Sequence, residues 1–193
     1  MTVVITVGGA NFGLTDGVGR ALGGYVRRQH RRHKIGPAQP SIPFSLARRV
    51  AEQQYANLRE AALSMREPFE LWGASSGAER IAELLHETAP EHLARVVLLG
   101  CPASQHGGVG GVGFRGPRTP VPSTRFETLV IARLGDPFAN ADQWGISQPR
   151  TEAAMTLSRL LGGGLAHADY SGVDLDECRT RAAEGNTRFL VAP

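Results

Sequence analysis

The chain has 193 residues, a size typical of one domain, and its 41% hydrophobic and 20% charged residues exclude a wholly disordered polypeptide. We therefore expect residues 1–193 to form a single domain. Its two cysteines are too few for a disulfide framework, and no apolar run approaches the roughly 20 residues of a transmembrane segment.

The formal charge of +3 comes from one segment of the chain, because five basic residues fall in the run 27–34. We interpret that run as a solvated turn, with an anionic lipid surface or phosphate as the alternative partner, and its lack of aromatic residues argues against nucleic acid.

Strands and helices alternate along the first half of the chain. The β-branched run 3–7 predicts a strand that is buried on both faces and ends in glycines. The glycine-rich stretch after it makes a long regular helix there doubtful, and a proline-marked loop follows. A helix is expected between Ser45, which could cap it, and Pro68, which ends it. A short strand over 69–72 and a second helix over 77–89 come next.

The second half continues the alternation. It contains a buried strand over 96–99, a long Gly/Pro-rich loop over 102–124 and a further strand over 126–132. Helices are expected over 151–161 and 174–183. Such alternation implies an α/β fold with a mostly parallel central sheet and helices on both faces. Chemistry in such sheets sits at the carboxyl ends of the strands.

The segment Gly73-Ala74-Ser75-Ser76-Gly77 matches the pattern GxSxG between a predicted strand and a predicted helix. In that context the pattern predicts a nucleophile elbow, in which a tight turn raises the serine hydroxyl above the sheet. The spacing makes Ser75 the nucleophile. The structural alternative is an ordinary Gly/Ser turn in which Ser75 or Ser76 caps the helix.

A serine hydroxyl needs a general base, and the base needs a group that orients it. In α/β-hydrolases these residues follow in the order serine, acid, histidine. Asp136 comes directly after a predicted strand and is our predicted acid, with Asp142 as its rival and an ordinary turn aspartate as the structural alternative. His167, the one histidine after Asp136, is the predicted base, and a solvated loop histidine is its alternative. Asp169 is a second carboxylate that could orient it.

Acyl transfer also needs two N–H donors aimed at the developing oxyanion. One is the amide of Ser76, and the other is expected from the glycine turn after the first strand, with Ala10 first and Gly9 second. Ala10 also breaks the G-x-G-x-x-G pattern, so nucleotide binding is not expected. Phe138 and Trp144 are predicted to line the acyl site, with ordinary packing as the alternative. Neither CxxC nor HExxH occurs, so we expect no metal and no cofactor.

Together these pieces resemble the cutinase-like branch of the α/β-hydrolases, which includes cutinases, PE-PPE esterase domains and the lysin B enzymes of mycobacteriophages. The elbow resembles their G-[YF]-S-Q-G-A pattern, residues 134–139 their G-D-P acid loop, and residues 167–170 their H-x-x-Y histidine loop. The opening V-G-G-A and the proline segment 36–43 resemble the corresponding parts of lysin B and PE-PPE domains. Two positions depart from the pattern, since Ala74 replaces an aromatic residue and Ser76 a glutamine, and the cysteine pattern of cutinases is absent.

The resemblance implies a serine esterase that acts on lipid esters and, within lysin B, on the ester between mycolic acids and arabinogalactan. The chain opens in a strand rather than a signal peptide, and it is rich in arginine. No peptidoglycan-binding, PE or PPE segment accompanies the matching residues. We therefore expect an actinobacteriophage protein in the host cytoplasm before lysis, or on the virion, that acts on the anionic cell envelope. The alternatives are a virion or tail component that retains the hydrolase fold, and an intracellular lipid esterase.

Overall fold

The computed structural model describes residues 2–9, 18, 30–35, 44–108, 120–140, 167 and 169–193, with the backbone alone for residues 30 and 44–51. In chain order its elements are β1 (Thr2–Val7), β2 (His30–Ile35), α3 (Phe44–Ser64), β3 (Phe69–Ala74), α4 (Ser76–Glu87), β4 (Leu93–Leu99), β5 (Glu127–Arg133), β6 (Arg179–Glu184) and β7 (Thr187–Ala192).

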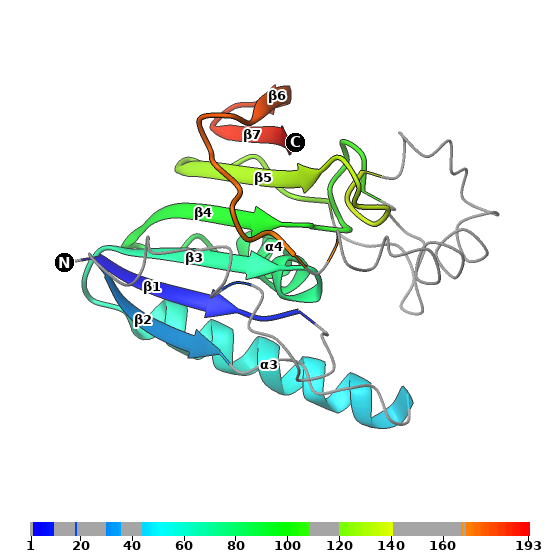
Figure 1. Cartoon of the computed structure of the whole chain (residues 1–193). Helices are drawn as coiled ribbons and strands as arrows, with labels where there is room; N and C mark the ends of the chain where they lie inside the picture. The colour runs from blue at the N-terminus through cyan, green and yellow to red at the C-terminus, as the bar shows by residue number, and fades with distance from the viewer. Residues whose placement is uncertain are drawn as a thin grey trace.

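The seven strands form one sheet in the order β2-β1-β3-β4-β5-β7-β6. Every neighbouring pair is parallel except β6 and β7, which form an antiparallel hairpin at one edge. The predicted mostly parallel sheet is therefore confirmed. The carboxyl ends of β1, β3, β4 and β5 lie at the same edge of the sheet, on the right of Figure 1.

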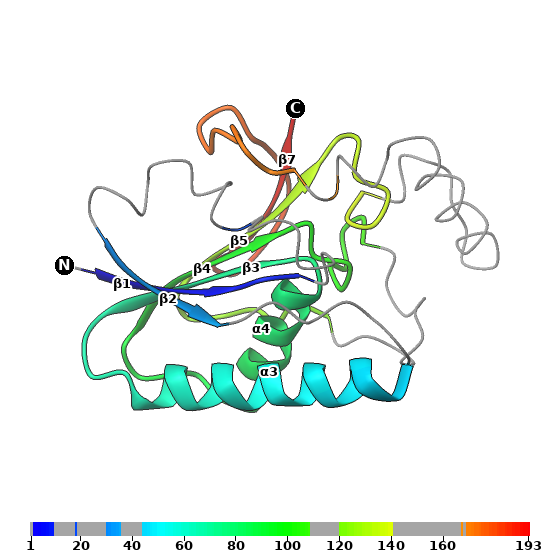
Figure 2. The ribbon, with the colours of Figure 1, turned by 60° about the horizontal axis from the view of Figure 1, so that its bottom comes forward.

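Two apolar cores form on the two faces of this sheet. Both described helices pack on one face, below the sheet in Figure 2, and α4 does so through Ala78, Ile81 and Leu84 at helical spacing. On the opposite face, Trp72 and Leu129 belong to the second cluster. The two cysteines are free and belong to different clusters. Within the described ranges, neither helix is long and apolar enough to cross a membrane.

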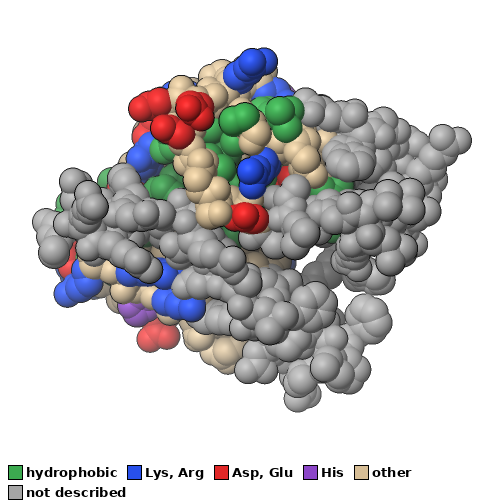
Figure 3. Space-filling view, in the orientation of Figure 1, with side chains coloured by type: hydrophobic (Ala, Val, Ile, Leu, Met, Phe, Trp, Pro, Cys, Tyr) green, Lys and Arg blue, Asp and Glu red, His purple; other side chains and the backbone are tan. Residues whose placement is uncertain are grey.

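The described part of the basic run is a strand, not the solvated turn that its charge predicted. Residues 30–35 form β2, which pairs in parallel with β1 over its whole length. Arg32 Nε donates to Thr6 Oγ1 at 2.9 Å, and Arg31 forms an ion pair with Glu67 at 2.7 Å. Charged side chains suit this position, because β2 is an edge strand whose open side must not attract another strand. In the space-filling view, basic side chains gather along this edge at the lower left (Figure 3).

The helix predicted over 174–183 is also wrong, because residues 174–178 are irregular and the chain then forms β6 and returns as β7. Leu, Arg, Ala and Glu in this stretch have high helix propensity, which favours a helix in isolation. Two residues, Gly185 and Asn186, connect the strands, and Gly185 has φ +59°, a conformation that glycine adopts without strain. The apolar partner strand β7 and this short turn therefore decide the structure of β6. The helix predicted over 151–161 lies outside the described residues.

Candidate active site

Ser75 lies at the sharp turn between β3 and α4. Its φ of 52° and ψ of −124° give the one positive φ among the non-glycine residues that the structure describes. The turn is held on both sides, since the Ser75 amide donates to Leu99 O at 2.9 Å and Glu79 N donates to Ser75 O at 3.2 Å. The Ser75 side chain makes no capping bond to α4. Its hydroxyl is therefore available to other partners, in a backbone conformation that costs energy and is typical of functional positions.

The two glycines of the elbow are required by close contacts. A Cβ added to Gly77 would lie 2.3 Å from Val7 O, and one added to Gly73 would lie 2.8 Å from the Cα of Ala78. Both distances are shorter than real Cβ contacts allow. The glycines thus allow β1, β3 and the first turn of α4 to approach closely, which places the elbow at the carboxyl edge of the sheet.

The structure brings Ser75, His167 and Asp136 together into one hydrogen-bonded chain. His167 Nε2 lies 2.8 Å from Ser75 Oγ, and His167 Nδ1 lies 2.9 Å from both carboxylate oxygens of Asp136. Asp169, the other carboxylate considered for this contact, instead accepts hydrogen bonds from Ser171. Asp142 lies outside the described residues. The histidine is thus placed between a hydroxyl and a carboxylate, which is the arrangement that general-base catalysis requires.

Asp136 is fully buried and its carboxylate is well supplied with donors. Besides His167, it accepts from the amides of Phe138 at 2.8 Å and Ala139 at 3.2 Å, and from the Tyr170 hydroxyl at 2.6 Å. Burial alone would raise its pKa, but the charge of His167 and the hydrogen bonds from His167, Tyr170 and Phe138 outweigh burial and lower the pKa below its usual value. Asp136 is therefore ionised at neutral pH.

The glycine turn after β1 lies against the elbow. A Cβ added to Gly9 would be 2.7 Å from the Cβ of Ser75, so Gly9 directly adjoins the serine. The side chain of Gln54, on α3, is buried and donates to Gly8 O at 3.0 Å, which holds this turn in place. Ser76 begins α4, where the first amides of a helix have no partner within it. Of the predicted oxyanion residues, Gly9 and Ser76 thus adjoin Ser75, and Ala10 lies outside the described residues.

Phe138 contacts the base itself. Its ring centroid lies 4.4 Å from that of His167, with the planes inclined by 40°. This packing restrains the imidazole, whatever Phe138 contributes to substrate contact. Trp144 falls outside the part of the chain that the structure describes. No group of three His, Cys, Asp or Glu side chains within that part is arranged to hold a metal ion.

Sequence reasoning missed four residues that hold this site. Tyr170 bonds Asp136, and its signal was present as the last letter of the H-x-x-Y resemblance. Gly100, with φ +56°, follows β4, and a Cβ added there would lie 3.0 Å from Oδ2 of the same carboxylate. Arg133 Nη1 donates to Asp169 O at 2.7 Å and so anchors the segment next to His167. Gln54 and Arg133 left no signal, because an isolated Gln or Arg in a helix or strand is ordinary.

Comparison with known proteins shows the fold. No family model matches the chain, and no curated protein matches its sequence. Among solved structures, a protein from Xanthomonas campestris pv. campestris assigned as a hydrolase of the alpha/beta superfamily aligns with TM-score 0.50 and 11% identity, over 89% of this chain and 96% of that one. A protein from Pectobacterium atrosepticum assigned as a YdeN-like hydrolase aligns with TM-score 0.49 and 18% identity, over 75% and 71% of the two chains. A cutinase-like protein from Cryptococcus sp. gives TM-score 0.47 and 15% identity, over 87% and 96%.

The fold is therefore that of the α/β-hydrolases, as the sheet order and the Xanthomonas structure together show. At this level of identity the likeness concerns the fold and not the activity.

Proposed function

We propose that this protein is a serine hydrolase of carboxylic esters, with Ser75 as nucleophile, His167 as general base and Asp136 as the acid that orients it. One observation carries the proposal: a continuous hydrogen-bond chain runs from Ser75 Oγ through both nitrogens of His167 to the buried Asp136 carboxylate. Asp136 is an acceptor at neutral pH, so Nδ1 carries the proton and Nε2 is free to accept one from Ser75.

The proposed reaction is acyl transfer in two steps. Ser75 Oγ attacks the ester carbonyl while His167 Nε2 takes its proton, and the carbonyl oxygen becomes an oxyanion. The Ser76 amide and a donor from the turn at Gly9 and Ala10 stabilise that charge. The C–O bond then breaks, His167 returns the proton to the leaving alcohol, and water hydrolyses the acyl-enzyme by the same route. Asp136 stabilises the charged imidazole throughout.

The substrate class that we propose is a lipid ester, and in its narrowest form the mycolyl-arabinogalactan ester of a bacterial envelope. Support for it comes from the resemblance of the elbow, acid loop and histidine loop to lysin B and PE-PPE domains. The protein would then belong to an actinobacteriophage, reach the envelope from the host cytoplasm or the virion, and need no cofactor. The exposed basic edge at β2 would favour an anionic envelope surface. A virion component with a retained hydrolase fold and an intracellular lipid esterase are the competing proposals.

The test of the reaction is Ser75→Ala with Ser76→Ala as its matched control. We expect Ser75→Ala to lose turnover of p-nitrophenyl esters by a factor on the order of 10⁴–10⁶, because it removes the hydroxyl that lies at His167 Nε2. Ser76→Ala keeps its backbone amide and should remain active. A fluorophosphonate probe should label Ser75 in the wild-type protein, as located by mass spectrometry of its peptides. Activity that survives in Ser75→Ala and disappears in Ser76→Ala would show that the nucleophile is Ser76 and not Ser75.

The test of the substrate class is kcat/KM across butyrate, octanoate and palmitate esters. A lipid esterase gains affinity by burying methylenes, at about 0.8 kcal/mol each, so medium and long chains should be preferred. Release of mycolic acids from mycolate-bearing cell wall tests the narrowest form. A steady fall from the shortest ester, with no release from cell wall, would reject a lipid substrate and leave a hydrolase of small esters.

A further inference from the structure

We propose that Tyr170 is a positioning residue for the acid and base, whose hydroxyl fixes the Asp136 carboxylate and limits how strongly that carboxylate attracts the proton on His167. This inference rests on the proposed function, because it assigns a role within the same reaction. Tyr170 follows His167 closely in the chain, and its side chain is 3% exposed in the core on the face opposite α3 and α4.

The direction of the Tyr170 hydrogen bond is determined by its neighbours. The hydroxyl oxygen lies 3.1 Å from the amide nitrogen of Arg133 and 2.6 Å from Oδ2 of Asp136. A backbone N–H can only donate, so Tyr170 accepts from Arg133. Its own proton is therefore directed to Asp136.

Tyr170 keeps that proton over the working range of an esterase. Burial, and then the negative charge of Asp136 and the hydrogen bond to it, raise the pKa of Tyr170 well above its usual value. The hydroxyl consequently donates to Asp136 throughout the pH range in which an esterase works. It remains the donor whether His167 is neutral or charged.

The two oxygens of Asp136 receive different donors. Oδ1 accepts from the amides of Phe138 and Ala139 and from His167, whereas Oδ2 accepts from Tyr170 and His167. Without the hydroxyl, Oδ2 would keep the His167 Nδ1–H alone. More negative charge would then face the imidazole and favour its charged form. The neutral imidazole that accepts a proton from Ser75 would form only at higher pH.

Gly100 leaves the space that the Tyr170 hydroxyl and the Asp136 carboxylate occupy. Gly100, at the end of β4, has φ +56°, and a Cβ there would lie 3.0 Å from Asp136 Oδ2 and 3.1 Å from the Tyr170 hydroxyl oxygen. Arg133 holds the neighbouring segment independently, since its side chain donates to Asp169 O at 2.7 Å. The Tyr170 ring is thus placed by packing and by Arg133, and removal of the hydroxyl should leave the fold intact.

The first experiment compares the pH dependence of kcat/KM in wild type, Tyr170→Phe and Tyr55→Phe, on one p-nitrophenyl ester. Tyr55 is on α3, packed against the other core, and is a matched control for loss of a phenolic hydroxyl. Tyr170→Phe should move the acid limb of the profile upward by about one pH unit, with KM little changed. Tyr55→Phe should superimpose on wild type. A Tyr170→Phe profile that coincides with wild type would overturn the proposal.

A conservative replacement tests the sign. A fluorotyrosine introduced at position 170 alone keeps the ring and has a more acidic hydroxyl, which donates more strongly to Asp136. The acid limb should then move downward, opposite to Tyr170→Phe. A shift in the same direction as Tyr170→Phe would show that packing, and not the hydrogen bond, is responsible.

A readout without turnover separates this inference from the proposed function. In a Ser75→Ala background, proton NMR can follow the Nδ1–H of His167, whose resonance lies far downfield when it is bonded to a carboxylate. Adding Tyr170→Phe should move it further downfield, because Asp136 becomes a stronger acceptor, and adding Tyr55→Phe should not. An unmoved resonance overturns the positioning role even if the protein is an esterase. A moved resonance in a protein that hydrolyses no ester supports the role and rejects the proposed function instead.

Discussion

The described residues include two histidine–carboxylate pairs that differ in what surrounds them. In the first, His167 Nδ1 lies 2.9 Å from Asp136, whose side chain is completely buried while that of His167 is 15% exposed. In the second, His106 Nε2 lies 2.6 Å from Glu184, with 33% and 41% of the two side chains exposed. By distance alone the second pair is the closer one.

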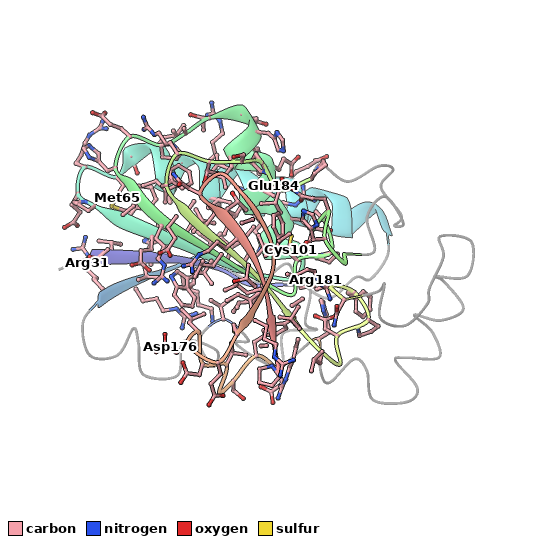
Figure 4. The ribbon with its side chains drawn as sticks, turned by 90° about the horizontal axis from the view of Figure 1, so that it is seen from above. Arg31, Met65, Cys101, Asp176, Arg181 and Glu184 are labelled. Atoms are coloured by element: carbon pink, nitrogen blue, oxygen red, sulfur yellow. The ribbon has the colours of Figure 1, made fainter. Side chains whose placement is uncertain are left out.

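The surroundings of the second pair indicate a structural role and not a catalytic one. The His106 ring packs edge-on against Phe189 with centroids 4.4 Å apart, and Gln105 donates to Glu184 at 3.0 Å. Arg181 donates to the His106 carbonyl oxygen at 3.0 Å. In Figure 4, Arg181 and Glu184 extend from β6 toward the loop after β4, where Cys101 lies. This pair fastens the loop to the C-terminal hairpin.

A histidine beside an acid is therefore not a catalytic signal by itself. What distinguishes His167 is a hydroxyl, Ser75 Oγ, at its second nitrogen, held by a strained turn at the strand end. Burial adds to the difference, because a carboxylate removed from water interacts more strongly with its histidine than an exposed one does.

The largest expected difference between the pairs is in turnover. Asp136→Asn should lower kcat on the order of 10⁴-fold, because an amide can donate to His167 Nδ1 and favour the wrong tautomer. Glu184→Gln, the same chemical change in the second pair, should leave kcat/KM close to wild type. Both are measured on one p-nitrophenyl ester with the purified variants. Equal losses in the two variants would mean that the two pairs work as one unit.

A smaller effect is expected from the glycines that shape the first pair. Gly100 and Gly172 both have positive φ, but a Cβ at Gly172 meets no atom within 4 Å. Gly172→Ala should therefore cost only the backbone strain, about 1–2 kcal/mol of unfolding free energy. Gly100→Ala should cost more, because its methyl group would press on Asp136 and Tyr170, and it should also reduce kcat.

Denaturant unfolding and ester hydrolysis measured on both variants separate the two contributions. Gly172→Ala sets the value for strain alone and should retain wild-type kcat. If Gly100→Ala matched it in both measurements, the close packing around Asp136 would be irrelevant to the site.

The smallest effect concerns stability at low pH. The pKa of Asp136 is lowered in the folded state, so its contribution is complete above the ordinary value of 3.8 and is lost as pH falls through the lowered folded value. The difference in melting temperature between wild type and Asp136→Asn should accordingly narrow as pH falls below about 4. The pKa of Glu184 is also lowered, chiefly by its hydrogen bond from His106. Its contribution to stability is therefore lost in the same direction, as pH falls.

Glu184 is exposed to solvent, which weakens its interaction with His106. The melting temperature of Glu184→Gln should therefore differ barely measurably from that of wild type over the same pH range. Thermal unfolding of the three proteins in parallel provides the comparison. If the difference in melting temperature between wild type and Asp136→Asn stayed constant down to about pH 2.5, the fold would not be stabilising the charged form of Asp136.

Local sequence was sufficient for the elbow, because its requirements lie within a few residues. An apolar strand, a glycine-flanked serine and an amphipathic helix predict the turn, and Ser75 adopts it with φ 52°. The order of acid and histidine along the chain likewise led to Asp136 and His167, which the fold then brings to the serine. The buried runs of β1, β3, β4 and β5 were found from their composition for the same reason.

Long-range pairing decided the rest, and no local pattern encodes it. The charged residues of β2 and β6 take strand conformation because β1 and β7 offer them backbone partners at the sheet edges. The prediction of a helix over 174–183 was wrong for this reason. The supports of the acid, Tyr170 and Gly100, approach Asp136 from separate segments, and only the assembled sheet brings them within contact. The sequence by itself thus determined which residues could carry the chemistry, whereas burial and contacts between distant segments decided how those residues are held together and which charged segments become strands.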